Sequence, residues 1–242
     1  MSENQKKIWV TGASSGIGKA VAEKFAREGW KVAVSARRKE LLEEMAKHEN
    51  IFSFPLDVTN FENCKSTFNQ VREQLGDIDI CFLCSGTYDP KKEQELNLEE
   101  NKFVMDVNYF GTLNCVKAVE KYFKEKKAGH ISIVSSIAGY RGLPNSGLYG
   151  VTKSALTFLS ESLYLELERN NIKVQVVNPG FIKTPMTDKL SEDQQNQILK
   201  NIPASRFGLP SDIASACIYL SSDEASFVTG STIHVNGGMG MF

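Results

Sequence analysis

Residues 6–29 of the chain read KKIWVTGASSGIGKAVAEKFAREG, and this stretch decides the fold. A short apolar run leads into Gly12, Gly16 and Gly18, after which apolar residues recur at helical spacing. The pattern predicts a strand, a glycine turn and a helix. Glycines in such a turn let the backbone approach a pyrophosphate, and the N–H groups that open the helix face its negative charge, with Ser14 and Ser15 adding donors. An ordinary glycine-rich turn is the alternative, but its place between a strand and a helix favours a nucleotide site.

The rest of the chain repeats this alternation. Strand-like apolar runs separate helical patterns at residues 31–36, 51–57, 77–86, 130–136, 171–180 and 230–238. No linker, internal repeat or low-complexity segment divides the 242 residues. The sequence therefore predicts an α/β fold in which residues 1–242 form a single domain, with a doubly wound parallel sheet of about seven strands and helices on both faces.

Composition narrows the choice of partners. The 28 basic and 29 acidic residues give a net charge of -1, so nothing favours nucleic acid or an anionic membrane as a partner. No apolar run reaches the roughly 18 residues of a membrane span, and the first residues lack the apolar core of a signal peptide. Five cysteines without disulfide-like spacing fit a reducing compartment. We therefore expect a cytoplasmic protein.

Cys81 and Cys84 form a C-x-x-C pair, which raises the question of redox or metal chemistry. Residues three apart on a strand point to opposite faces, which suits neither a disulfide nor shared metal ligation. No second cysteine pair or nearby histidine completes a zinc set. Core packing is the favoured role of both cysteines, no metal site is predicted, and a structural role is expected for the scattered histidines His48, His130 and His234.

The residues that follow the second and third predicted strands bear on the cofactor. A dinucleotide-binding unit normally has an acidic residue roughly 20 residues beyond its glycines. Here Ala36 stands in that place, followed by Arg37 and Arg38. A guanidinium can bind a 2′-phosphate that a carboxylate would repel, so NADP(H) is favoured over NAD(H). Arg37 is the preferred ligand, and decoration of the next helix is the alternative for either arginine. Asp57 suits an adenine contact or a helix cap equally well.

Tyr149 and Lys153 lie four residues apart at the start of a helical pattern, so both side chains leave one helix face. A neighbouring ammonium moves the pKa of a phenol toward neutrality, which would make the tyrosine a proton shuttle. Ser136 ends the preceding strand and would bring a hydroxyl. A Y-x-x-x-K spacing alone is common on helix surfaces. Asn108, in an apolar helical stretch, indicates either an internal hydrogen bond that fixes packing or a local break that frees a carbonyl for a water.

Five motifs occur in a fixed order along nearly the whole chain: TGASSGIG at 11–18, DVNYFGT at 106–112, SSIAG at 135–139, YGVTK at 149–153 and NPGFIKTP at 178–185. Together they resemble the classical short-chain dehydrogenase/reductase family. The resemblance implies a Rossmann-type sheet, a nicotinamide cofactor and a homotetramer or homodimer. It implies that Tyr149 is the acid or base, that Ser136 bonds the substrate oxygen, and that Lys153 binds ribose and lowers the tyrosine pKa. Asn108 would hold a proton-relay water.

The arguments above and the resemblance together give the predicted cofactor contacts, which are Gly12, Ser14, Ser15, Gly16, Ile17, Gly18, Arg37, Arg38, Asp57, Val58, Gly86, Tyr149, Lys153, Pro179, Gly180, Ile182 and Thr184. One departure is plain, because Leu83, Cys84, Ser85 and Gly86 stand where the family commonly has N-N-A-G. The missing asparagines bear on local stability and cofactor affinity more than on the chemistry.

The expected activity is NADP(H)-dependent hydride transfer between the nicotinamide and a small carbonyl or secondary alcohol substrate, with Tyr149 moving the proton. A non-catalytic NADP-binding sensor or scaffold is the alternative from another class. Among enzymes, a reductase of 3-oxoacyl thioesters, of small hydroxy acids or of steroid-like ketones stays open. An acyl-carrier partner would want basic residues at the pocket mouth, for which Arg141, Lys183 and Arg206 are candidates. The polar segment at about 184–208 predicts a substrate lid.

Overall fold

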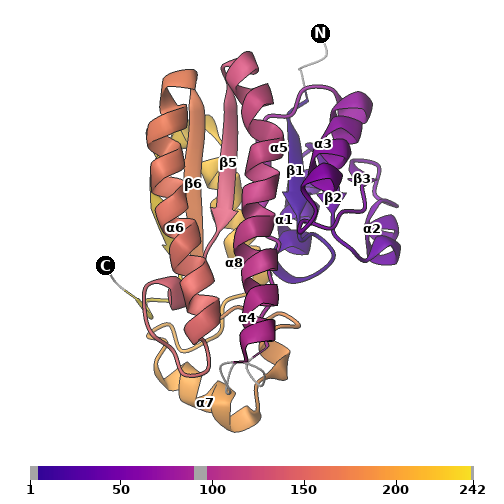
Figure 1. Ribbon diagram of the computed structural model, residues 1–242. Helices are drawn as coiled ribbons and strands as arrows, with labels where there is room; N and C mark the ends of the chain where they lie inside the picture. The colour runs from indigo at the N-terminus through magenta and orange to yellow at the C-terminus, as the bar shows by residue number, and fades with distance from the viewer. Residues whose placement is uncertain (1–4, 90–96, 241–242) are drawn as a thin grey trace.

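Seven parallel strands form one sheet in the order β3-β2-β1-β4-β5-β6-β7 (Figure 1). The computed structural model describes residues 5–89 and 97–240. The strands are β1 Lys7–Thr11, β2 Lys31–Ser35, β3 Ile51–Ser53, β4 Ile80–Leu83, β5 Gly129–Val134, β6 Ile172–Pro179 and β7 Thr232–Val235. The predicted fold class is confirmed.

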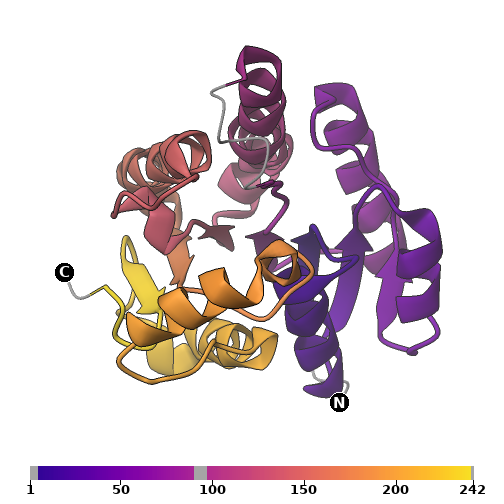
Figure 2. The same cartoon turned by 90° about the horizontal axis from the view of Figure 1, so that it is seen from below.

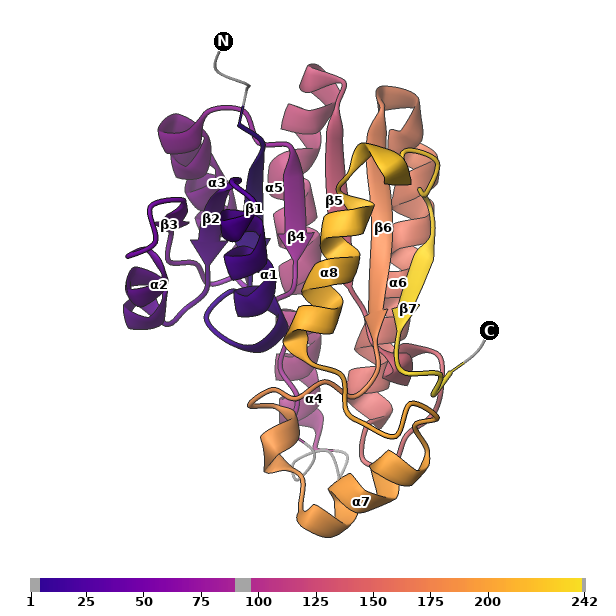
Figure 3. The same ribbon diagram turned by 180° about the vertical axis from the view of Figure 1, so that it is seen from behind.

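Helices cover both faces of the sheet. They are α1 Gly16–Arg27, α2 Lys39–Met45, α3 Phe61–Leu75, α4 Leu98–Met105, α5 Gly111–Lys126, α6 Gly147–Leu167, α7 Glu192–Lys200 and α8 Pro210–Leu220. Helices α3, α5 and α6 lie on one face (Figure 1), and α1 and α8 lie on the other (Figure 3). Successive strand side chains alternate between the faces, so Trp9 enters one core while Ile8 and Val10 enter the other. This double burial explains why the strands are continuous apolar runs.

The third strand is shorter than the sequence predicts. Residues 51–57 were expected to be extended throughout, but β3 ends at Ser53. Beyond this end the N–H groups of Phe54 and Leu56 still bond the carbonyls of Val34 and Ala36, at 2.9 and 3.0 Å, and Pro55 lies between them, where an N–H would point away from β2. Asp57 therefore lies in a turn beyond the strand.

The helix that contains Asn108 is interrupted by one wide turn. Residues Asp106–Phe110 form a π-helical turn between α4 and α5. Such turns are rare and occur often at functional sites. The local break considered for Asn108 is present in the structure.

The two cysteines of the C-x-x-C pair pack on opposite faces of the sheet, as predicted. Cys81 belongs to the core under α3, α5 and α6, and Cys84 packs against the core under α1 and α8. All five cysteines carry free thiols.

The chain reverses its direction across the sheet between β1 and β4. It runs outward from β1 through β2 to β3, then crosses back to place β4 on the other side of β1. In open parallel sheets, ligands bind at the carboxyl edge where the order reverses. Figure 2 views the molecule from this edge, where α7 crosses in front of the strand ends. No helix within residues 5–89 and 97–240 is long and apolar enough to cross a membrane.

Candidate active site

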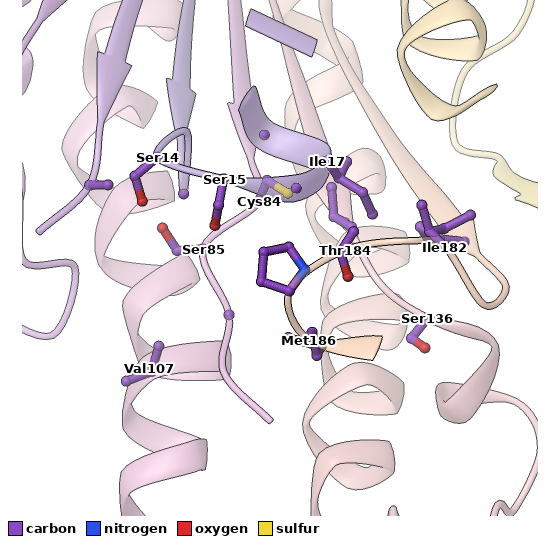
Figure 4. A pocket seen from close by; sticks show the side chains of 18 of the residues that line it. Ser14, Ser15, Ile17, Cys84, Ser85, Val107, Ser136, Ile182, Thr184 and Met186 are labelled. Atoms are coloured by element: carbon purple, nitrogen blue, oxygen red, sulfur yellow. The ribbon is translucent and has the colours of Figure 1, made fainter. Parts of the chain in front are cut away.

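A cleft of about 560 Å³ lies at the carboxyl edge of the sheet, across the point where the strand order reverses. Every residue predicted to contact the cofactor lines it: Gly12, Ser14, Ser15, Gly16, Ile17, Gly18, Arg37, Arg38, Asp57, Val58, Gly86, Tyr149, Lys153, Pro179, Gly180, Ile182 and Thr184. Figure 4 shows Ser14 and Ser15 at one end of this cleft and Ser136 toward the other. Residues far apart in the sequence thus meet in one elongated site.

The glycine turn brings β1 and α1 closer together than any other residue type would allow. A Cβ atom on Gly18 would lie 2.4 Å from the carbonyl oxygen of Gly12, and one on Gly12 would lie 2.7 Å from the carbonyl oxygen of Cys84. Ser15 precedes α1 with an extended backbone, and its hydroxyl makes no cap hydrogen bond. The N–H groups that open α1 are therefore not capped by Ser15, and although that of Gly18 bonds the Cys84 sulfur, the opening of this helix at the cleft fits a cofactor phosphate.

Arg38 lies against the serines of the glycine turn. Its guanidinium donates to the hydroxyl of Ser14 at 2.8 and 3.2 Å and to that of Ser15 at 2.9 Å. Arg37 also lines the cleft, with an exposed side chain. The sequence favours Arg37 as the phosphate ligand because it is nearest the strand, and Arg38 is the arginine that the structure bonds to the serines of the turn.

Asp57 orders the turn that precedes α3. One of its carboxylate oxygens accepts from the N–H of Thr59 at 3.0 Å and from its hydroxyl at 2.8 Å. The cap of α3 is Asn60, whose side chain accepts from the N–H of Asn63 at 2.9 Å. Asp57 is therefore not the helix cap, and it lines the cleft where the adenine contact was expected.

Lys153 is buried, with 4% of its surface exposed, and its Nζ donates to the carbonyl of Val134 at 2.9 Å. Burial penalises the ammonium and lowers the pKa of Lys153 to about 8, while the adjacent Cys84 thiol acts in the opposite direction. The Nζ atom lies 5.6 Å from the centre of the Tyr149 ring. The two side chains therefore lie close together, as their four-residue spacing on one helix predicts.

Ser136 and Tyr149 lie where the cleft meets a second cavity. Tyr149 is in the first turn of α6, and Ser136 follows β5, where its hydroxyl accepts from the N–H of Ala138 at 3.2 Å. Both residues line the cleft and also the second cavity, which has a volume of about 460 Å³. A carbonyl group entering from the second cavity would meet both hydroxyls at this junction.

Asn108 does not line the cleft or the second cavity. Its buried amide accepts from the N–H of Thr87 at 2.7 Å and donates to the Thr87 carbonyl at 3.0 Å and to the Thr152 hydroxyl at 3.1 Å. The Asn108 carbonyl accepts from the hydroxyl of Thr112 at 2.8 Å. The side chain thus fixes packing between the loop after β4 and α6, alongside the break in the backbone.

These contacts explain how the chain tolerates its departure from N-N-A-G. The N–H of Cys84 donates to the Thr11 hydroxyl at 3.2 Å, and Leu83 is buried in the core. A Cβ atom on Gly86 would lie 3.5 Å from Asn108 Oδ1 and 3.6 Å from Lys153 Nζ. The loop after β4 is therefore fixed by Thr11 and Asn108, and it passes beside the lysine at Gly86.

The second cavity is lined by residues that motifs do not identify, among them Tyr88, Leu143, Phe181, Met186, Gln194, Ile198 and Met239. Its walls are the loop before α6 and the segment between β6 and α8. Both ends of that segment are joined by backbone bonds, from the Lys183 N–H to the Gly208 carbonyl and from the Gly208 N–H to the Phe181 carbonyl, each at 2.9 Å. The segment predicted as a lid, at about 184–208, supplies Met186, Gln194 and Ile198, and Phe181 directly follows the glycine after β6.

The three candidate basic residues have different surroundings. Arg141 lines the second cavity and donates to the carbonyl of Met239 at 3.2 Å. Arg206 forms a two-point pair with Asp212, at 2.7 and 3.3 Å, which occupies its guanidinium. Lys183 is exposed and lines neither the cleft nor the second cavity. In the part of the chain that the structure describes, no group of His, Cys, Asp or Glu could hold a metal ion.

Comparisons with known proteins agree with this geometry. The model of the family described as Enoyl-(Acyl carrier protein) reductase matches residues 12–240. The chain is 36% identical to the 3-oxoacyl-[acyl-carrier-protein] reductase FabG of Staphylococcus aureus, covering 98% of both chains, and 36% identical to that of Salmonella typhimurium, covering 100% of both. The crystal structure of gox2181 matches with a TM-score of 0.89 and 25% identity, over 97% of this chain and 95% of the other. The chain therefore belongs to the short-chain dehydrogenase/reductase family and is an oxidoreductase.

Proposed function

We propose that this protein is an NADP(H)-dependent carbonyl reductase whose substrate is a 3-oxoacyl thioester, and that it runs in reverse as an alcohol dehydrogenase. The observation that carries the proposal is the junction of the two cavities at Ser136 and Tyr149. The substrate class is supported by the names of the two relatives, which reduce 3-oxoacyl groups on acyl-carrier protein. The volume of the second cavity, about 460 Å³, leaves room for an acyl chain.

The residues at the junction divide the work of the reaction. When bound, the nicotinamide supplies or accepts the hydride, which side chains cannot do. Ser136 and Tyr149 hydrogen-bond the substrate oxygen as negative charge develops on it, and one such donor is worth roughly 3 kcal/mol of barrier. Tyr149 gives or takes the proton, and the Lys153 ammonium favours its phenolate. Because the pKa of Lys153 is about 8, its side chain is mostly in the ammonium form at neutral pH. Asn108 keeps the loop after β4 in place.

The preference for NADP(H) is assigned to Arg38 and Arg37. The experiment compares kcat/KM with NADPH and with NADH for the wild type and for Arg38→Asp and Arg37→Asp. Losing a charge-assisted bond to the 2′-phosphate should lower the preference for NADPH by about ten- to a hundredfold. An unchanged ratio in both variants would refute the phosphate assignment.

The activity itself is tested with purified protein, NADPH and two substrate sets, acetoacetyl thioesters and simple ketones. The proposal expects NADPH oxidation with both sets and a higher kcat/KM for the thioesters. A higher kcat/KM for the ketones would reject the thioester class. If the protein bound NADPH tightly but neither substrate set led to NADPH oxidation, the proposed enzymatic activity would be rejected. The protein would then be better explained as an NADP-binding sensor or scaffold.

We also propose a homotetramer or homodimer in the cytoplasm. On α6, Val151, Phe158 and Leu165 are exposed by 55%, 73% and 73%, and they recur every seven residues on one helix face. A contiguous apolar face of this kind usually marks a protein interface. Phe158→Glu should therefore lower the mass measured by sedimentation, and an unchanged mass would argue against this face. The five free thiols support a reducing compartment.

A further inference from the structure

The loop after β4 carries one aromatic side chain, Tyr88, into the wall of the second cavity. Its hydroxyl donates to the carbonyl of Asn145 at 2.9 Å and lies 2.9 Å from the hydroxyl of Ser146. A phenol has one proton, and a carbonyl can only accept. The Ser146 hydroxyl is therefore the donor in the second bond.

The two partners of Tyr88 define where α6 begins. Ser146 is the residue from which the helix starts, and Asn145 adopts a left-handed conformation with φ of 56°. Asparagine tolerates this conformation better than most residues, but it still needs a surrounding that holds it. Tyr149 follows three residues after Ser146, in the first turn of the helix. The Tyr88 hydroxyl thus fixes the backbone that carries Tyr149.

The ring of Tyr88 also contacts the ring of Tyr149. The ring centres are 4.8 Å apart and the planes are tilted by 43°. Tilted aromatic pairs at this distance attract each other beyond simple burial. Tyr88 therefore restrains Tyr149 twice, through the backbone at the start of α6 and through the side chain itself.

Tyr88 is itself held from both sides. Thr87 is bonded through both its N–H and its carbonyl to the buried amide of Asn108. On the other side, the carboxylate of Asp89 pairs with Lys189 in the segment between β6 and α8, at 3.3 Å. A side chain anchored in this way can transmit the position of the β4 loop to the start of α6.

We infer that Tyr88 is a positioning residue for Tyr149 and that its ring sets the width of the second cavity beside the two hydroxyls. The inference rests on the proposed function, because it takes Tyr149 as the proton donor. Loss of the hydroxyl would release the turn before α6 and misplace Tyr149. Loss of the ring would also open the cavity to bulkier ketones.

A double-mutant cycle tests the positioning role. The variants are Tyr88→Phe, Ser146→Ala and their combination, with Tyr219→Phe on α8 as the matched control, because Tyr219 lines neither the cleft nor the second cavity. Each of the first two should lower kcat about fivefold, the size of one lost hydrogen bond, and the combination should be no worse than either alone. The NADPH dissociation constant should stay at the wild-type value and the melting temperature should fall by only about 2–4 °C, as expected for one lost hydrogen bond, which separates positioning from a general structural role.

The size-selecting role is tested with Tyr88→Ala and a series of ketones of increasing bulk. The ratio of kcat/KM for a branched ketone to that for a small ketone should rise at least severalfold over the wild type. Wild-type rates in Tyr88→Phe, additive losses in the double variant, or an unchanged ketone ratio would each overturn the inference. These results leave the proposed function standing as long as the wild type oxidises NADPH. A wild type that binds NADPH without turnover would reject the proposed function and this inference with it.

Discussion

The cleft and the second cavity share Ser136 and Tyr149 but are built in different ways. The cleft is formed by strand ends and by the start of α1, whose positions follow from the hydrogen-bonded register of the sheet. The second cavity is formed by loops and by α7, in a segment whose two ends are joined at Gly208. The cleft is thus fixed by the fold, whereas the second cavity depends on local contacts such as those of Tyr88. Substitutions in the cleft should therefore reduce binding or stability more than substitutions in the walls of the second cavity do.

Substitution of one glycine in each region should give the largest difference between the cleft and the second cavity. A Cβ atom on Gly18 would overlap the carbonyl of Gly12, whereas one on Gly142, beside the second cavity, meets no atom within 4 Å. Gly18→Ala should weaken NADPH binding by about 3 kcal/mol, roughly a hundredfold, because the overlap is with backbone that cannot move cheaply. Gly142→Ala should leave NADPH affinity and the free energy of unfolding within about 0.5 kcal/mol. Calorimetric titration with NADPH checks both, and equal losses in the two variants would contradict the contrast.

Unfolding at low pH tests whether the cleft and the second cavity lose their structure together, because both depend on the same sheet. His130 on β5 is buried, and burial, with the charge of Lys173, lowers its pKa to about 4 from 6.5. As pH falls below 6.5 the unfolded chain binds a proton that the folded protein refuses until about pH 4. The free energy of unfolding should therefore fall by about 3 kcal/mol across this interval.

His130→Gln should remove this part of the pH dependence, and His48→Gln, with an exposed side chain, is the matched control. Urea unfolding at pH 6.5 and 4.5 measures the difference. NADPH binding and the helical signal should be lost in one transition, because the cleft and the second cavity are both built on β5 and the strands beside it. Two separated transitions would show that the second cavity unfolds on its own.

The ion pair between Asp89 and Lys189 gives the smallest expected effect. The pair joins the loop after β4 to the segment between β6 and α8, with both side chains partly exposed. Exposed pairs are worth under about 1 kcal/mol, so Lys189→Gln should raise the substrate KM only about two- to threefold and leave NADPH affinity unchanged. Lys121→Gln, which removes a pair with Glu125 within α5, is the control. A larger change in NADPH affinity than in substrate KM would contradict the placement of this ion pair in the wall of the second cavity.

The same contrast explains how much could be predicted from the sequence. Gly12, Gly18, Tyr149 and Lys153 were predicted because glycine approach, the opening of a helix and four-residue spacing are local rules. The end of β3 was placed too late, because the apolar run continues to Leu56 while the register with β2 ends at Ser53. The bonds of Arg38 to Ser14 and Ser15 could not be predicted, because spacing does not encode which guanidinium turns back toward the serines.

Tyr88 could not be predicted for a similar reason. Its partners, Asn145 and Ser146, lie 57 and 58 residues further along the chain. No local pattern links them, and only the folded sheet brings the loop after β4 next to the start of α6. The lid at about 184–208 stays a prediction.

Tyr149→Phe tests the central claim most directly, because it removes one oxygen and keeps the ring that packs against Tyr88. NADPH binding by titration and NADPH oxidation with an acetoacetyl thioester are measured on the same preparation. The account predicts a dissociation constant within about twofold of the wild type, and a turnover lower by about a thousandfold, the scale of a lost proton donor. Turnover near the wild-type rate, or loss of NADPH binding in parallel with turnover, would contradict the assignment of Tyr149 as the proton donor at the junction of the two cavities.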